Sequence, residues 1–229
     1  LRLVSDTMAG SLDLLIHQLA ERAEKHRHTM MAGRTHSQQA LPITFGFKVA
    51  HWIAPLLRHQ HRLEELKPRL LVLQFGGAVG TLASLGDKGL KVAEELAIRL
   101  GLFLPLTSWH TQRDTLVEFA GWLSLVTGSL AKMAQDIILM TQSEVGEVQE
   151  SNEPSHGGSS TMPQKRNPVI SEMIIAAARQ NATLLSSMHQ AMIQEHERAT
   201  GSWQLEWATL PQMLHLTMTG LKKALFLSE

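Results

Sequence analysis

Two long stripes of apolar residues constrain this chain more than any other feature of its sequence. Between residues 113 and 142 the apolar residues recur in alternating steps of three and four, the spacing of one face of a helix. The first stripe consists of Leu116, Phe119, Leu123, Val126, Leu130, Met133, Ile137 and Met140. It predicts a helix of about 30 residues, which at 1.5 Å per residue is about 45 Å long. A chain that contains such a helix is expected to be elongated.

The second stripe follows Pro168 with the same spacing, and Asn181 is its one polar member. The apolar members are Ile170, Ile174, Ala177, Leu184, Met188 and Ala191. The sequence predicts further helices at residues 8–25, 44–66, 88–100 and 203–227, with kinks or breaks at Pro55 and Pro68. Since no segment alternates convincingly as a strand, the expected fold is all-α: an elongated bundle of long helices. Helices that bury a face against several neighbours can also pack across subunits, so we expect an oligomer.

Charge and composition exclude several classes of function. The 21 Lys and Arg residues balance the 21 Asp and Glu residues, which argues against a general electrostatic grip on nucleic acid or on an anionic membrane. The absence of cysteine excludes disulfides, zinc–thiolate sites, iron–sulfur clusters and thiol nucleophiles, and it fits a cytoplasmic location. Of the twelve histidines, the close pairs are two residues apart, a spacing that does not share a helix face, so no metal site is expected.

The longest uncharged stretch covers residues 70–86. It is shorter than the roughly 20 residues that a membrane span needs, and we interpret it as a buried helix whose glycines allow close helix packing. The N-terminus lacks a basic region followed by an apolar run, so no targeting signal is expected.

Two polar segments interrupt the helical pattern. Residues 30–46 place Gly, Arg, Thr, His, Ser and Gln side chains between two helices, and residues 150–168 are rich in Gly, Ser, Pro, Asn and charge. Connections as long as the second are usually functional or disordered, and a merely solvated loop is the alternative. Asn167 and Pro168 are predicted as the N-cap and first residue of the next helix. The segment lacks the second glycine and the preceding strand of a nucleotide-binding P-loop.

Three motifs resemble those of the fumarase/aspartase superfamily. Residues 158–168, GSSTMPQKRNP, match its GSSxMPxKxNP signature at every defined position. Residues 33–36, GRTH, and residues 112–114, QRD, resemble two further elements in the correct order. The resemblance implies that residues 1–229 form the central helical-bundle domain with a signature loop at 150–168, and that the N-terminal and C-terminal family domains are largely absent. It also implies a homotetramer whose active sites are shared between subunits.

The same resemblance implies the roles of individual residues. Ser159 would exchange a proton with a substrate carbon, assisted by Lys165. His36 would face the other end of the substrate and be oriented by Glu172. Substrate binding would fall to Thr35, Arg34, Arg113, Ser160 and Asn167, although Arg113 could instead simply occupy a helix end. The substrate would be a small polycarboxylate, and neither cofactor nor metal would be needed.

Within the superfamily, three further segments resemble the branch that closes lactones from carboxymuconates. They are residues 68–77, residues 109–114 and the stretch from Glu195 to Arg198 with Trp203, Glu206 and Trp207 beyond it. The adenylosuccinate lyase branch is the alternative, but it must hold a nucleotide phosphate, and no Lys or Arg occurs between Arg198 and Lys222. A third alternative is a noncatalytic structural protein on the same scaffold, like the lens crystallins related to argininosuccinate lyase. It is disfavoured because five site residues are all present: His36, Ser159, Lys165, Asn167 and Glu172.

Overall fold

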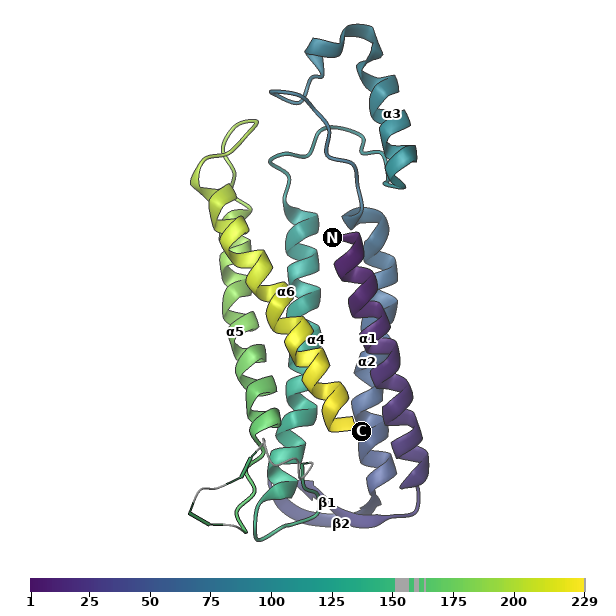
Figure 1. Ribbon diagram of the computed structural model, residues 1–229, viewed down its shortest axis with the longest axis vertical. Helices are drawn as coiled ribbons and strands as arrows, with labels where there is room; N and C mark the ends of the chain where they lie inside the picture. Colours follow the sequence, from purple (N-terminus) through teal and green to yellow (C-terminus); the bar gives the residue numbers. More distant parts are fainter. Residues whose placement is uncertain (151–156, 159–160, 163, 229) are drawn as a thin grey trace.

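The computed structural model describes all residues of the chain except 151–156, 159–160, 163 and 229. Figure 1 shows an elongated bundle with a small helical arm at one end and a hairpin and loop at the other. The helices are α1 (Arg2–Lys25), α2 (Phe45–Leu70), α3 (Gly89–Leu100), α4 (Asp114–Thr141), α5 (Val169–Ala191) and α6 (Gly201–Ser228), with a short 3-10 helix, η1 (Ala83–Lys88), before α3. The predicted all-α bundle is confirmed.

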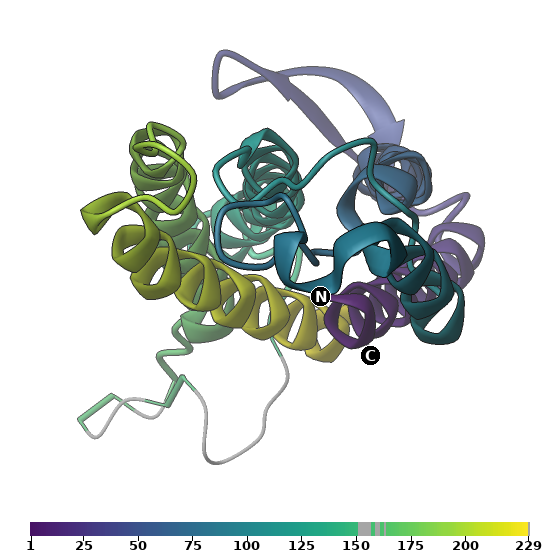
Figure 2. The ribbon, with the colours of Figure 1, turned by 90° about the horizontal axis from the view of Figure 1, so that it is seen from above.

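Helix α4 is the centre of the bundle because its apolar residues are buried against three neighbours. It packs on α2, α5 and α6, while α1 closes the bundle against α2 and α6. Figure 2, which looks along the bundle, shows α4 between α5 and α2, with α6 crossing from α5 to α1. Of the predicted stripe, Phe119, Leu123 and Val126 are fully buried, and Ile137 is half-buried. By length and composition α4 could also cross a membrane, a property that core helices of bundles share.

Asn181, the polar residue on the second stripe, is buried where α4, α5 and α6 meet. Its amide nitrogen donates to the hydroxyl oxygens of Thr127 and Thr217, at 3.4 and 2.9 Å. Its Oδ1 is buried without a hydrogen-bond partner among the described residues. Asn181 therefore joins the three helices through its side-chain nitrogen.

The expectation that no strand is present was wrong. Residues 30–44 form an antiparallel hairpin of β1 (Met30–Thr35) and β2 (Gln38–Thr44), between α1 and α2. A two-stranded ribbon with mostly exposed side chains has no buried face to produce an apolar alternation, so the usual strand signal is missing.

The prediction of a buried helix at residues 70–86 was also wrong. α2 ends at Leu70, and the chain continues without regular structure to η1. Gly77 and Gly80 have φ values of +70° and +91°, a backbone conformation that helices exclude and glycine tolerates. A Cβ on Gly76 would lie 2.5 Å from the hydroxyl oxygen of Ser108, so this glycine serves a close loop contact and not helix packing.

Neither Pro55 nor Pro68 breaks α2, which runs through both residues, so of the predicted kinks or breaks the breaks were wrong and the kinks stay a prediction. Val49, Trp52, Leu56 and Leu63 bury one face of α2 in the core, and this packing outweighs the loss of a helical hydrogen bond at each proline.

His59 is a buried titratable group at the α2–α4 contact, with an exposed fraction of 3%. Its Nε2 lies 2.8 Å from the Ser129 hydroxyl oxygen, and its Nδ1 lies 3.2 Å from a guanidinium nitrogen of Arg62. Burial, followed by the charges of Arg62 and Arg58, lowers the pKa of His59 from 6.5 to about 4. The imidazole is therefore neutral at physiological pH.

We predict that His59 makes the fold sensitive to acid. Because its pKa is lower in the folded chain, the unfolded chain binds the extra proton first as the pH falls below about 6.5, and stability falls progressively until about pH 4. The expected loss between pH 7 and pH 4.5 is about 2–3 kcal/mol. Urea unfolding of the wild type and of His59→Gln at both pH values measures it. Equal pH dependence in the two proteins would contradict the prediction.

Candidate active site

The β1–β2 hairpin presents His36 at its tip. Thr35 pairs with Gln38, which leaves His36 and Ser37 as a two-residue turn with φ values of +50° and +63°. Such turns suit the twist of a hairpin, but the left-handed conformation is costly for residues other than glycine. The turn exposes both Thr35 and His36 to solvent, so these predicted site residues are available to a substrate or to another protein surface.

Arg34 points from β1 toward the segment that follows α4. Its two terminal nitrogens each lie 2.8 Å from one carboxylate oxygen of Glu147. This hydrogen bond raises the pKa of Arg34 above its ordinary value. The β-bulge at Gly33, where a Cβ would approach the Leu41 carbonyl oxygen to 2.7 Å, precedes this arginine. The predicted role of Arg34 in substrate binding stays a prediction, and its guanidinium binds the Glu147 carboxylate of the same chain.

The described part of the signature loop lies beside the start of α5. Lys165, Asn167 and Glu172 line a cleft of about 800 Å³ between the end of α4 and the start of α5. The backbone nitrogen of Asn167 donates to the Gly157 carbonyl oxygen at 2.9 Å. Ser159 and Ser160 lie outside the described residues, so their predicted roles stay predictions. In this cleft the Lys165 ammonium and the Asn167 side-chain amide can bind an anionic group, whereas the Glu172 carboxylate repels one.

The N-cap of α5 differs from the prediction. α5 begins at Val169, and the residue before it, Pro168, makes no side-chain cap. Instead Glu150 accepts hydrogen bonds from the backbone nitrogens of Ile170 and Ser171 and from the Ser171 hydroxyl, at 3.1, 2.9 and 2.6 Å. A carboxylate at a helix N-terminus is favoured both by the free N–H groups and by the helix dipole.

His36 and Glu172 lie at the same end of the bundle, the end that carries β1, β2 and the signature loop in Figure 1. Both side chains are exposed, and among the described residues of this chain no hydrogen bond joins them. The predicted orientation of His36 by Glu172 is not tested by one chain and stays a prediction.

Arg113 lies at the opposite end of the bundle, where α4 begins. Its guanidinium makes two hydrogen bonds to the Glu206 carboxylate, at 2.7 and 2.5 Å, and stacks 5.1 Å from the ring of Trp109. Arg113 and Glu206 are both buried. The structure thus does not bring Arg113 together with the other predicted site residues within one chain. Its predicted substrate role stays a prediction, and its observed partner is internal.

A second polar cluster surrounds His110 at the same end. Gln74 and Arg198 approach its Nδ1, while its Nε2 is buried. Burial lowers the pKa of His110, and the charge of Arg198 lowers it further. Arg198 also donates to the carbonyl oxygens of Gly77 and Ala78. These contacts bring together Gln74, His110 and Arg198, one residue from each of the segments 68–77, 109–114 and 195–198.

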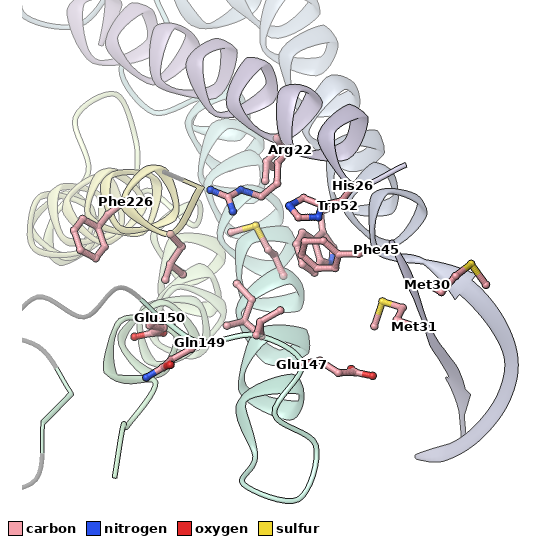
Figure 3. Close-up of a pocket in the computed structure, with 15 residues that line it drawn as sticks. Arg22, His26, Met30, Met31, Phe45, Trp52, Glu147, Gln149, Glu150 and Phe226 are labelled. Atoms are coloured by element: carbon pink, nitrogen blue, oxygen red, sulfur yellow. The ribbon is translucent and has the colours of Figure 1, made fainter. Parts of the chain in front are cut away.

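A further cavity of about 700 Å³ lies under the end of α1. Figure 3 shows the aromatic rings of Phe45 and Trp52 on one side of it, near His26, and residues 147–150 along its rim. The Trp52 indole nitrogen donates to Asp136 at 2.7 Å, and Phe45 meets the Trp52 ring edge-on. Both apolar and charged side chains line this cavity, Leu19 and Arg22 among them.

Sequence reasoning missed three structural carboxylates: Glu147, Glu150 and Glu206. In the sequence, Glu206 belongs to a segment that resembles the lactone-closing branch, and nothing marks it as the partner of an ion pair. The need for a buried carboxylate follows only from the burial of Arg113, which the structure shows. Glu150 was included only as the edge of the loop. Its partners lie 20 and 21 residues along the chain, so no local pattern could identify it as a helix cap.

The chain is similar in sequence to a known family and to curated proteins. A family model described as lyase matches residues 1–182. The chain is 54% identical over 218 residues to a 3-carboxy-cis,cis-muconate cycloisomerase of Pseudomonas aeruginosa, covering 95% of this chain and 48% of the relative. It is 46% identical over 215 residues to trans-aconitate decarboxylase 1 of Mycosarcoma maydis, covering 94% and 44%.

A solved structure gives the same result. The 3-carboxy-cis,cis-muconate lactonizing enzyme from Pseudomonas putida superposes with a TM-score of 0.94 at 51% identity, covering 100% of this chain and 51% of that one. The chain therefore spans about half the length of the curated relatives it matches.

We predict that the Arg113–Glu206 pair is essential to the fold at its end of the bundle. Glu206→Gln leaves the arginine buried without a compensating charge, which costs about 3–5 kcal/mol. Glu118→Gln is the control, because Glu118 also forms a two-bond pair, with Arg69, but on the surface. Chemical denaturation should show a large loss of unfolding free energy for Glu206→Gln and little change for Glu118→Gln. Similar losses in both would contradict the prediction.

Proposed function

The chain belongs to the lyase (fumarase/aspartase) family, and from that premise we propose that the complete protein is a 3-carboxy-cis,cis-muconate cycloisomerase. The observation that carries the proposal is the 54% identity to the Pseudomonas aeruginosa enzyme over nearly the whole of this chain. The signature at residues 158–168 is shared by the whole superfamily and supports the type of chemistry, since it retains Ser159, Lys165 and Asn167. The reaction belongs to the breakdown of aromatic compounds by way of protocatechuate.

The proposed reaction is an intramolecular addition. A carboxylate oxygen of the substrate forms a bond to one carbon of a double bond, and the neighbouring carbon takes up one proton. The negative charge that develops on that carbon is delocalised into its attached carboxylate before protonation. Because both reacting groups belong to one molecule, a site that holds the substrate in the attacking conformation supplies much of the rate.

We assign the proton transfer at carbon to Ser159. Its alkoxide form needs a nearby positive charge, and Lys165 is the residue of the signature that can supply it. Lys165 and Asn167 line the cleft beside α5 and would also bind the substrate carboxylate on which charge accumulates. His36, with Glu172, would act at the other end of the substrate, and Thr35 and Ser160 would complete the binding groups.

We further propose that the protein is a cytoplasmic homotetramer with active sites shared between subunits. Apolar residues exposed on the outer faces of α4 and α5 support this, among them Leu125, Leu139 and Met173. The exposure of both His36 and Glu172 supports it too, because each remains available to a neighbouring subunit. Residues 1–229 would then be the central domain, with the N-terminal and C-terminal domains supplied by the rest of the protein.

A second candidate is another lyase of the same family that acts on a small polycarboxylate. The 46% identity to trans-aconitate decarboxylase 1 favours it over adenylosuccinate lyase, for which the stretch after Arg198 lacks phosphate-binding cations.

Substrate assays of the complete protein discriminate between these candidates. We predict that 3-carboxymuconate is consumed, with loss of the ultraviolet absorbance of its conjugated double bonds, while trans-aconitate and adenylosuccinate remain. The three compounds are tested side by side at equal concentration. Consumption of trans-aconitate or adenylosuccinate alone would refute the proposed activity.

Removing the Ser159 hydroxyl tests the mechanism. In Ser159→Ala we expect turnover to fall by about 10²–10⁴-fold, the range that a positioned proton-transfer group contributes. Circular dichroism should be unchanged. Ser186→Ala is the matched control, because Ser186 is an exposed serine on α5 whose hydroxyl donates only to the Thr183 carbonyl oxygen in the described contacts. Near-normal turnover of Ser159→Ala would exclude the assignment.

A further inference from the structure

Residues 147–150, which we call the strap, connect the end of α4 to the signature loop. The Glu147 backbone nitrogen donates to the Met140 carbonyl oxygen at 2.9 Å, and Val148 packs against the main core. Gly146, with φ of +58°, makes the turn that directs the strap away from α4. The strap is therefore held to the bundle by its own backbone and by one apolar side chain.

One end of the strap is joined to the β1–β2 hairpin. The Arg34–Glu147 pair uses both carboxylate oxygens and both terminal nitrogens, and the side chains are only 25% and 23% exposed. A bidentate, partly buried pair is directional, unlike a single contact between exposed charges. It ties the strand that precedes His36 to the strap.

The other end of the strap is joined to α5. Glu150 binds two backbone nitrogens and one hydroxyl at the start of that helix. The same helix carries Glu172 in its first turn, and Lys165 and Asn167 precede it. Figure 3 shows Glu147 on the side of the strands and Glu150 on the side of α5, so the two side chains leave the strap in opposite directions.

The strap also forms a wall shared by two cavities. Val148, Gln149 and Glu150 line both the cleft beside the signature loop and the cavity under α1. Any displacement of the strap would change the shape of the cleft that contains Lys165 and Asn167, and through Glu147 it would also move the hairpin.

We propose that Arg34, Glu147 and Glu150 are positioning residues. Through the strap they hold the β1–β2 hairpin, which carries the GRTH motif, at a fixed position relative to the start of α5, which follows the signature loop of the same chain. Arg34 holds Glu147 and does not contact the substrate. The proposal rests on the proposed function only for its kinetic test, since the contacts of the strap exist without any substrate.

A double-mutant cycle on the complete protein tests the Arg34 assignment. We expect Arg34→Gln and Glu147→Gln each to lower kcat about tenfold with little change in KM, because both release the same contact and misplace the site slightly. The double variant should lose about tenfold as well, and not the hundredfold of two independent effects. A normal kcat in Glu147→Gln together with a raised KM in Arg34→Gln would instead show that Arg34 binds substrate, and would overturn the proposal.

Hydrogen exchange of the free protein tests Glu150 without any activity. In Glu150→Gln the amides of Ile170 and Ser171 should exchange about tenfold faster, because one cap acceptor is lost. Glu144→Gln is the control, as Glu144 is exposed just before the strap. Unchanged exchange in Glu150→Gln would refute the strap as an anchor. If 3-carboxymuconate is not consumed, the proposed function fails, whereas this exchange measurement still decides the role of Glu150.

Discussion

The structure depends on the burial of α4 against α2, α5 and α6. Apolar side chains cover most of its circumference, so they can be removed from water only if other helices surround it, and that burial is the main source of stability in such a bundle. The long antiparallel helices then separate two ends of the molecule. Each end carries irregular segments, and the residues with predicted site roles lie in these segments or in the helix turns beside them.

The buried polar groups give the bundle one arrangement instead of several. Asn181 joins three helices, His59 joins α2 to α4, and the Arg113–Glu206 pair joins the start of α4 to α6. Each would be costly if its partner were absent, so a shifted helix register would leave unpaired groups in the interior. Apolar packing alone would tolerate such shifts more easily.

The candidate site occupies the end of the bundle that holds the hairpin and the signature loop. Its described residues surround the cleft beside α5, and the strap connects that cleft to the strand before His36. The exposure of His36 and Glu172 is consistent with a site completed by further protein surface. The signature motif, the hairpin and the cleft therefore lie at the same end of the molecule, whereas Arg113 lies at the other.

The sequence by itself determined the helical bundle, the family and the segments that carry the motifs. Periodicity over α4 and α5 was sufficient because a core helix repeats its apolar residues locally, and the signature is contiguous. The hairpin, the irregular course of residues 70–86 and the cap of α5 were decided only by the tertiary structure. Arg34 reaches a carboxylate 113 residues away, and Arg113 reaches one 93 residues away. Partners so distant leave no local pattern, because only packing of the helices brings their charges within hydrogen-bonding distance.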